Sequence, residues 1–98
     1  MMAQRAHRVD HELMDEPHVS GRRISVLQLY EQVGERGRHP GEVAEQLDLD
    51  VADVYAALAY YYDHPDEMAA VRKRRDSRQQ RLREDVAEER PDGVSPPE

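Results

Sequence analysis

Apolar side chains recur at helical spacing in three short segments, which glycine and proline separate from one another. The first segment starts after Ser25, the second at Pro40 and the third after Asp50. Spacing of i, i+3, i+4 and i+7 is typical of a helix that buries one face. The expected core positions are Val26, Leu29, Tyr30 and Val33, then Val43, Ala44 and Leu47, then Val51, Val54, Tyr55, Leu58 and Tyr61 or Tyr62. The sequence therefore predicts a mainly α fold with a core of three helices.

Residue types at the ends of these segments support the helix assignments. Ser25 and Asp50 are suitable N-caps, because their side-chain oxygens can accept hydrogen bonds from unpaired backbone N–H groups. Pro40 suits a first turn, where its missing N–H would have no partner anyway. Glycine within residues 34–37 suits a helix end, and the His-Pro pair at residues 64–65 should end the third helix.

Residues 42–61 have the spacing of a helix-turn-helix, in which two crossed helices share one core. Ala44 permits close approach of the second helix, and Asp48 replaces the usual glycine of the turn because aspartate tolerates a left-handed backbone. A motif of this kind reads DNA from the start of its second helix. The residues expected to be exposed there are Asp50, Ala52, Asp53, Ala56 and Ala59. None has a side chain suited to reading bases, and the aspartates would repel phosphates, so this helix is expected to be a poor DNA reader.

A small N-terminal β-hairpin or ribbon is expected before the helices. Residues 8–14 alternate loosely between polar and apolar, which indicates a short strand. Glu-Pro at residues 16–17 interrupts this strand and Ser-Gly at residues 20–21 supplies a turn, so that residues 22–24 are predicted to form the second strand.

Beyond the third helix the chain is helix-prone, highly charged and poor in apolar residues, of which it has Met68, Val71, Leu82 and Val86. Such a helix buries no face by itself and needs a partner, or it frays. The expected organisation is a disordered N-terminus over residues 1–7, a helix-turn-helix domain with its ribbon over 8–64, a long charged helical arm over 65–90 and a disordered tail over 91–98.

Composition limits the classes of protein to which this chain can belong. The 98 residues suffice for one domain, and a domain this small often pairs with a copy of itself, so a homodimer is expected. The lack of cysteine excludes disulfides and thiolate zinc sites. The longest apolar run, residues 55–62, is too short to cross a membrane, and residues 1–8 do not form a secretory signal. A cytoplasmic protein that does not bind membranes is therefore expected.

The charge balance is acidic and rich in arginine. The formal net charge is -7, and Lys73 is the single lysine among 14 basic residues. Many acids and few lysines resemble the proteins of extreme halophiles, whose carboxylates hold water and cations in concentrated salt. The alternative is a genome rich in G and C, which favours arginine codons.

A basic cluster interrupts this acidic background in the arm. Its members are Arg72, Lys73, Arg74, Arg75, Arg78, Arg81 and Arg83. Three interpretations stay open: a phosphate-binding stripe, a docking arm that pairs arginines with carboxylates of a partner protein, and a solvated face paired with the acids that follow. High intracellular salt would weaken the first, because counterion release loses its driving force. Arg22 and Arg23 in the ribbon are further candidates for binding nucleic acid or a partner.

No set of residues predicts catalysis, a cofactor or a metal site. His7 and His11 have a spacing that suits a metal on a helix, but they lie in a strand-like stretch without a third ligand. No serine or cysteine nucleophile stands beside a histidine, and no glycine-rich phosphate loop is recognised. The residues expected in core or dimer packing are Val54, Leu58, Tyr60, Tyr61 and Tyr62. A binding module rather than an enzyme is therefore expected.

Several residues between Pro17 and Tyr61, a stretch of about half of the chain, form a pattern that is seen in one known family. They are the run from Pro17 to Val26 (Pro-His-Val-Ser-Gly-Arg-Arg-Ile-Ser-Val), Gly37, Pro40, Glu42-Val43-Ala44, Leu47 and the run Val-Tyr-Ala-Ala-Leu-Ala-Tyr-Tyr at residues 54–61. This pattern resembles the domain-of-unknown-function family four-three-three, often described as VapB-like antitoxins. The opening run is the most specific part, and Arg22 stands there in place of the usual threonine.

The resemblance implies an antitoxin of a type II toxin–antitoxin pair, whose partner is a PIN-like ribonuclease toxin. Such antitoxins dimerise through the N-terminal domain, bind operator DNA in some systems, and cover the toxin's active site with a C-terminal segment. Because PIN-type sites are acidic and bind metal, we expect an arginine from residues 72–83 to enter the site and compete with the metal. The alternatives are a stand-alone dimeric DNA-binding transcriptional regulator and a structural adaptor in a larger complex.

Overall fold

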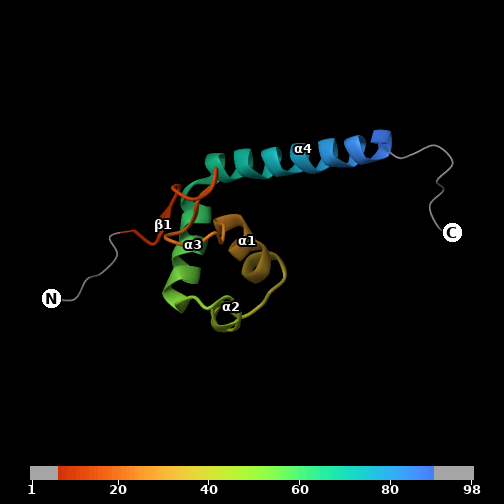
Figure 1. The fold of residues 1–98 in the computed structure, drawn as a ribbon. Helices are drawn as coiled ribbons and strands as arrows, with labels where there is room; N and C mark the ends of the chain where they lie inside the picture. The colour runs from red at the N-terminus through yellow and green to blue at the C-terminus, as the bar shows by residue number, and fades with distance from the viewer. Residues whose placement is uncertain (1–6, 90–98) are drawn as a thin grey trace, which may run out of the picture.

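The computed structural model describes residues 7–89 and shows a mainly helical protein with a long helix at its C-terminal end (Figure 1). The elements are β1 (Val9–Asp10), β2 (His18–Val19), α1 (Val26–Tyr30), a π-helical turn η1 (Glu31–Glu35), α2 (Pro40–Leu47), α3 (Val51–Asp63) and α4 (Pro65–Glu89). The predicted mainly α fold with an N-terminal hairpin and a long C-terminal helix is confirmed. The disorder expected for residues 1–7 and 91–98 concerns segments that lie, apart from His7, outside the described residues.

The helix ends are those that the local sequence predicts. The Ser25 hydroxyl accepts a hydrogen bond from the Gln28 N–H at 3.0 Å, and Pro40 is the first residue of α2. Asp48 ends α2 with a left-handed backbone (φ 55°), as expected for an aspartate in place of the turn glycine. Asp50 caps α3 through a reciprocal capping box with Asp53. These boundaries were predictable because each depends on residues that are neighbours in sequence.

The position of the second strand was predicted wrongly. The strand that pairs with β1 is β2, which lies before the turn and not at residues 22–24, and Val9 opposes Val19 in an antiparallel register. The first strand is also shorter than residues 8–14. The reason is that the turn is tight: Gly21 takes φ 76°, Arg22 N–H donates to the Val19 carbonyl at 3.0 Å, and residues 22–24 complete the turn. The fully buried Val19 thereby enters the core as part of the strand.

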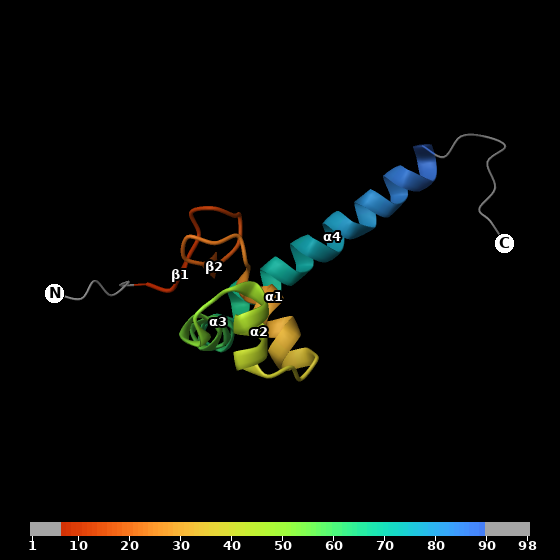
Figure 2. The ribbon, with the colours of Figure 1, turned by 60° about the horizontal axis from the view of Figure 1, so that its bottom comes forward.

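One hydrophobic core joins the ribbon to all the helices. Its buried residues are Val19, Ile24, Val26, Leu27, Leu29, Val43, Ala44, Val54, Ala57, Met68 and Val71. Met68 and Val71 belong to the first turns of α4, so this end of the arm is packed against the domain. The rest of α4 continues away from the other helices, and the two views of the ribbon agree on this (Figures 1 and 2).

The phase of α3 also differs from the prediction. Val51 and Tyr55 were expected in the core, but they are 45% and 57% exposed, whereas Val54 is buried as expected and Ala57, which was not expected in the core, is buried beside it. Asp53 was expected at the surface, but it is 3% exposed and accepts a hydrogen bond from Arg8 at 3.0 Å. The bulky side chains suggested a buried face, whereas contact with α1 and α2 selects the smaller Val54 and Ala57. None of the helices within residues 7–89 is long and apolar enough to cross a membrane.

Candidate partner-binding surface

Arg72 holds α4 against the stacked rings of Tyr30 and Tyr61 and so serves as an anchor. Its guanidinium donates to the Tyr61 hydroxyl at 3.2 Å and to the Glu35 carboxylate at 3.0 Å. It also lies over the ring of Tyr30, 5.5 Å from the centroid, and Tyr30 stacks on Tyr61 at 3.6 Å. The hydrogen bonds to Tyr61 and Glu35 raise the pKa of Arg72 above its ordinary value. Arg72 is therefore part of the domain rather than of an open surface.

Arg75, one turn further along α4, forms a second anchor. It donates to Glu16 at 2.7 Å and to the Ser25 hydroxyl at 2.9 Å, and Glu31 lies 3.7 Å away. Glu16 and Ser25 are both buried, so the guanidinium supplies hydrogen bonds to polar groups that are largely shielded from water. Ser25 therefore both caps α1 and accepts a hydrogen bond from α4.

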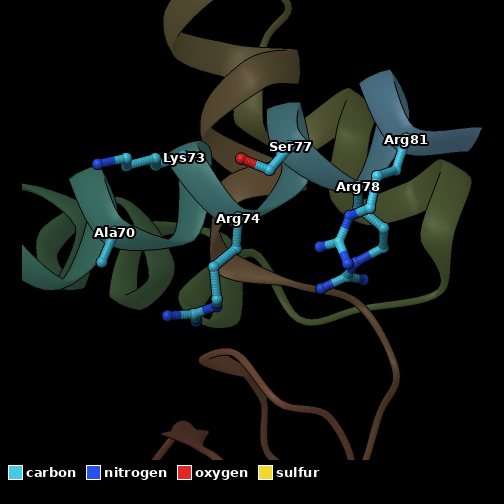
Figure 3. Close-up of a pocket in the computed structure, with 6 residues that line it drawn as sticks. All are labelled: Ala70, Lys73, Arg74, Ser77, Arg78 and Arg81. Carbon is cyan, nitrogen blue, oxygen red and sulfur yellow. The ribbon is translucent and has the colours of Figure 1, made fainter. Parts of the chain in front are cut away.

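A set of basic residues on the other side of α4 lacks such partners. We call Lys73, Arg74, Arg78 and Arg81 the basic face. Together with Ala70 and Ser77 they line an open depression of about 410 Å³, because residues three and four apart share one side of a helix. Figure 3 shows Arg74 and Arg78 projecting from the same side of α4. Within the part of the chain that the structure describes, these four side chains make no hydrogen bond or ion pair.

The half of α4 that lies farther from the domain, residues 78–89, also exposes apolar side chains, and we call it the outer half of α4. Leu82 and Val86 are 64% and 58% exposed, and they stand one turn apart on the side that continues the line of Met68 and Val71. Arg83 lies beside them at the edge of a second shallow depression. The outer half of α4 therefore combines an apolar pair with basic side chains.

This combination is suited to an acidic protein surface. Arginine binds carboxylates in a bidentate geometry, and an exposed apolar pair gains free energy when a partner covers it. A nucleic-acid backbone offers no apolar surface to Leu82 and Val86.

Arg22 and Arg23, the basic candidates in the ribbon, are both held by backbone carbonyls. The Arg22 guanidinium donates to the carbonyls of Leu47 and Asp48, each at 2.8 Å, and so satisfies the end of α2. Arg23 donates to the Leu13 carbonyl at 2.7 Å. No short sequence pattern predicts these contacts, because the partners are backbone atoms up to 26 residues away.

The residues expected in core or dimer packing take different positions. Val54 is fully buried, Leu58, Tyr60 and Tyr61 are partly buried against the core, and Tyr62 is 66% exposed. Their role in a dimer stays a prediction.

A polar cluster that the sequence did not suggest connects the ribbon, α3 and α4. The Tyr60 hydroxyl donates to Glu67, and His11 Nε2 lies 2.7 Å from the other oxygen of the same carboxylate. Burial and the hydrogen bond to Glu67 raise the pKa of Tyr60 to about 12. Burial alone would raise the pKa of Glu67, but the hydrogen bonds from Tyr60 and His11 lower it below its ordinary value. Among residues 7–89 no group of three potential ligands is placed to hold a metal ion.

The comparison with known families concerns the domain rather than the basic face. Residues 11–61 match the family described as Protein of unknown function (DUF433), which is just over half of the 98 residues. No curated protein and no solved structure matches the chain. The matched segment runs from the loop after β1 into α3 and ends before α4 begins, so the basic face lies outside it. The resemblance found in the sequence is confirmed, and the chain belongs to the DUF433 family.

Proposed function

We propose that this protein is the antitoxin-like member of a type II toxin–antitoxin pair, in which α4 binds and neutralises a PIN-like ribonuclease. The observation that carries the proposal is the basic face of α4, whose cations have no partner among the described residues and which lies next to exposed Leu82 and Val86. A partner that supplies carboxylates for the arginines and an apolar surface for Leu82 and Val86 would stabilise such a helix.

The antitoxin resemblance and the geometry favour the same part of the chain. PIN-type nucleases bind metal in acidic sites, and an arginine placed there competes with the metal for the carboxylates. Arg74, Arg78 and Arg81 are suited to this role because nothing in residues 7–89 holds their guanidinium groups. Arg72 and Arg75 are not, since both hold α4 on the domain. In this proposal the protein inhibits an enzyme and has no catalytic role of its own.

Binding of operator DNA is a weaker proposal for this chain. The exposed residues at the start of α3 are Asp50, Val51 and Tyr55, and none forms the bidentate contacts with guanine or adenine that arginine, asparagine or glutamine form. A regulator or an adaptor of a larger complex would therefore have to use a surface other than α3.

Charge reversal on the basic face tests the proposed function. We expect the full-length triple variant Arg74→Glu, Arg78→Glu and Arg81→Glu to lose neutralisation of a PIN-like ribonuclease from the same organism, measured as growth on co-expression and as cleavage of an RNA substrate. Arg75 is left unchanged because its loss would disturb the fold. Two controls separate charge from geometry.

The first control is Arg36→Glu, which changes an exposed arginine outside α4 and should leave neutralisation intact. The second replaces the same three arginines by lysine, which keeps the charge but removes bidentate pairing, and should give an intermediate loss. Full neutralisation by the glutamate variant, with circular dichroism unchanged, would contradict the proposal.

A further inference from the structure

The solvent side of α3 carries no charge over more than three turns. Between Asp50 and Asp63 the helix has a single charged residue, Asp53, and that residue is buried. The side that faces solvent presents Val51, Ala52, Tyr55, Ala56, Ala59 and Tyr62. Charged residues make up 36% of the whole chain, so this uncharged face stands apart from the rest of the sequence.

The fold itself does not account for this face. The opposite side of α3 already supplies Val54 and Ala57 to the core. A helix that packs on one side normally has polar residues on the other, whereas a helix that is apolar all round is covered on both sides. Tyr55 nevertheless remains 57% exposed, and Tyr62 remains 66% exposed although its ring meets the edges of Tyr30 and Tyr61. An uncharged, partly apolar face of this kind is typical of an interaction surface.

The order of residues on this face specifies the shape of its partner. Ala52, Tyr55, Ala59 and Tyr62 are separated by three, four and three residues, which is the spacing of a seam between two paired helices. Small and large residues alternate along the seam. In a parallel pair of identical helices alanine would meet alanine and tyrosine would meet tyrosine, leaving voids and clashes in turn. In an antiparallel pair each tyrosine meets an alanine.

We propose that α3 binds α3 of a second copy of this chain in an antiparallel pair. The two-fold axis crosses the helix pair at the level of residue 57 along the helix. Tyr55 of each copy then lies opposite Ala59 of the other, and Ala52 lies opposite Tyr62. Every large residue then fills the space above a small one, as a self-complementary two-fold interface requires. The seam itself holds no charged residue, so the pairing of two copies with a formal net charge of -7 buries no carboxylate.

The area available predicts a weak dimer. Fully burying one tyrosine removes about 150–250 Å² from water. From the exposed fractions of Tyr55 and Tyr62, the four tyrosines of a dimer contribute roughly 400–600 Å². Val51 and the alanines add to this, and the sum lies at or below the low end of stable interfaces, about 1,200 Å². We therefore expect dimerisation to depend on concentration.

This inference goes beyond the proposed function, because it uses a different helix and needs no nuclease. It assigns the second helix of the helix-turn-helix to self-association, so a dimer formed in this way cannot present that helix to DNA. The seam uses no residue of α4, so each copy keeps its own arm.

Sedimentation velocity of the full-length chain over a range of concentrations provides the first test. We expect a monomer–dimer equilibrium for the unchanged protein and a monomer at every concentration for Tyr55→Glu. Tyr55 is exposed, so the variant should fold, which circular dichroism checks. The matched control is Leu82→Glu, which places the same charge at an exposed apolar site on α4 and should leave the dimer intact. A monomer at all concentrations of the unchanged protein overturns the proposal.

Cysteine cross-linking tests the antiparallel arrangement, because the chain has no cysteine of its own. Under oxidation, a mixture of the Ala52→Cys and Tyr62→Cys variants should form a disulfide-linked dimer, and Ala52→Cys alone should not. Linking of Ala52→Cys to itself would show a parallel pair and overturn the proposal. If Tyr55→Glu instead abolished nuclease neutralisation while the unchanged protein stayed monomeric, the face would belong to the nuclease, and the second copy would be excluded.

Discussion

Arg74 and Arg75 are neighbours in sequence with different roles. Arg75 holds buried Glu16 and the Ser25 hydroxyl, at 2.7 Å and 2.9 Å, whereas Arg74 lines the open depression on α4. A basic run on a helix turns its members to different sides, so adjacent arginines need not share a function. The cluster of seven basic residues in the sequence thus divides into two anchors, the basic face and Arg83.

We predict that Arg75→Ala lowers the free energy of unfolding by about 1–3 kcal/mol, because it leaves the buried Glu16 carboxylate without its cation. Arg74→Ala is the matched control and should change it by less than about 0.5 kcal/mol, as is usual for exposed positions. Urea unfolding followed by circular dichroism measures both. Equal losses for the two variants would show that Arg75 is not an anchor.

The Tyr60–Glu67 contact predicts how stability depends on pH. The pKa of Glu67 is lowered in the folded state from 4.5, so its contribution is present above pH 4.5 and is lost as the pH falls through the folded pKa. The pKa of Tyr60 is raised from 10.0 to about 12, so its contribution is complete below pH 10 and is lost as the pH rises to about 12. Tyr60→Phe should flatten both limbs of a plot of melting temperature against pH, and Tyr55→Phe should not. An unchanged curve for Tyr60→Phe would refute the assignment.

At the scale of elements, α4 consists of two parts with different support. Its first turns bury Met68 and Val71 and carry both anchors, whereas the exposed Leu82 and Val86 lie in the outer half. A helix without packing is marginally stable in water. The predicted domain boundary after residue 64 stays a prediction, but a truncation there would remove Met68 and Val71 from the core. Substitutions in the full chain are therefore the better test of the arm.

Amide hydrogen exchange of the protein alone should reveal this division. We predict strong protection in α1, α3 and the start of α4, and protection that declines after Arg75 toward the end of the helix. Protection at both ends of α4 with fast exchange in its middle would contradict this division of the helix. Uniform protection as far as residue 89 would contradict it as well.

Prediction from sequence succeeded for local features and failed for those that depend on distant partners. The caps at Ser25 and Asp50 and the left-handed Asp48 depend on residues within a few positions. The strand at β2 and the phase of α3 depend on pairing with segments far along the chain, and the fully buried Val19 could not be told from a turn residue. The arginine-rich segment was recognised by composition, but its division into anchors and basic face required the positions of Glu16, Glu35 and Tyr61.

At the scale of the whole molecule, charge is distributed unevenly over the surface. The formal net charge is -7, yet the basic face occupies one side of α4 and the solvent side of α3 carries no charge. We propose the first of these surfaces as the site for an acidic nuclease and the second as the site for another copy of the chain. A halophilic origin stays a prediction; in salt of about 1 M the screening length falls to roughly 3 Å, and direct arginine–carboxylate contacts would then matter more than long-range attraction.

Amide hydrogen exchange of the full-length chain, alone and mixed with a purified PIN-like ribonuclease from the same organism, tests whether α4 binds the nuclease. We predict new protection over the outer half of α4, in the segment that holds Arg78, Arg81 and Leu82, with α2 unchanged. Binding that protects the domain and leaves the outer half of α4 unprotected would contradict this prediction, as would a failure of the ribonuclease to bind at all.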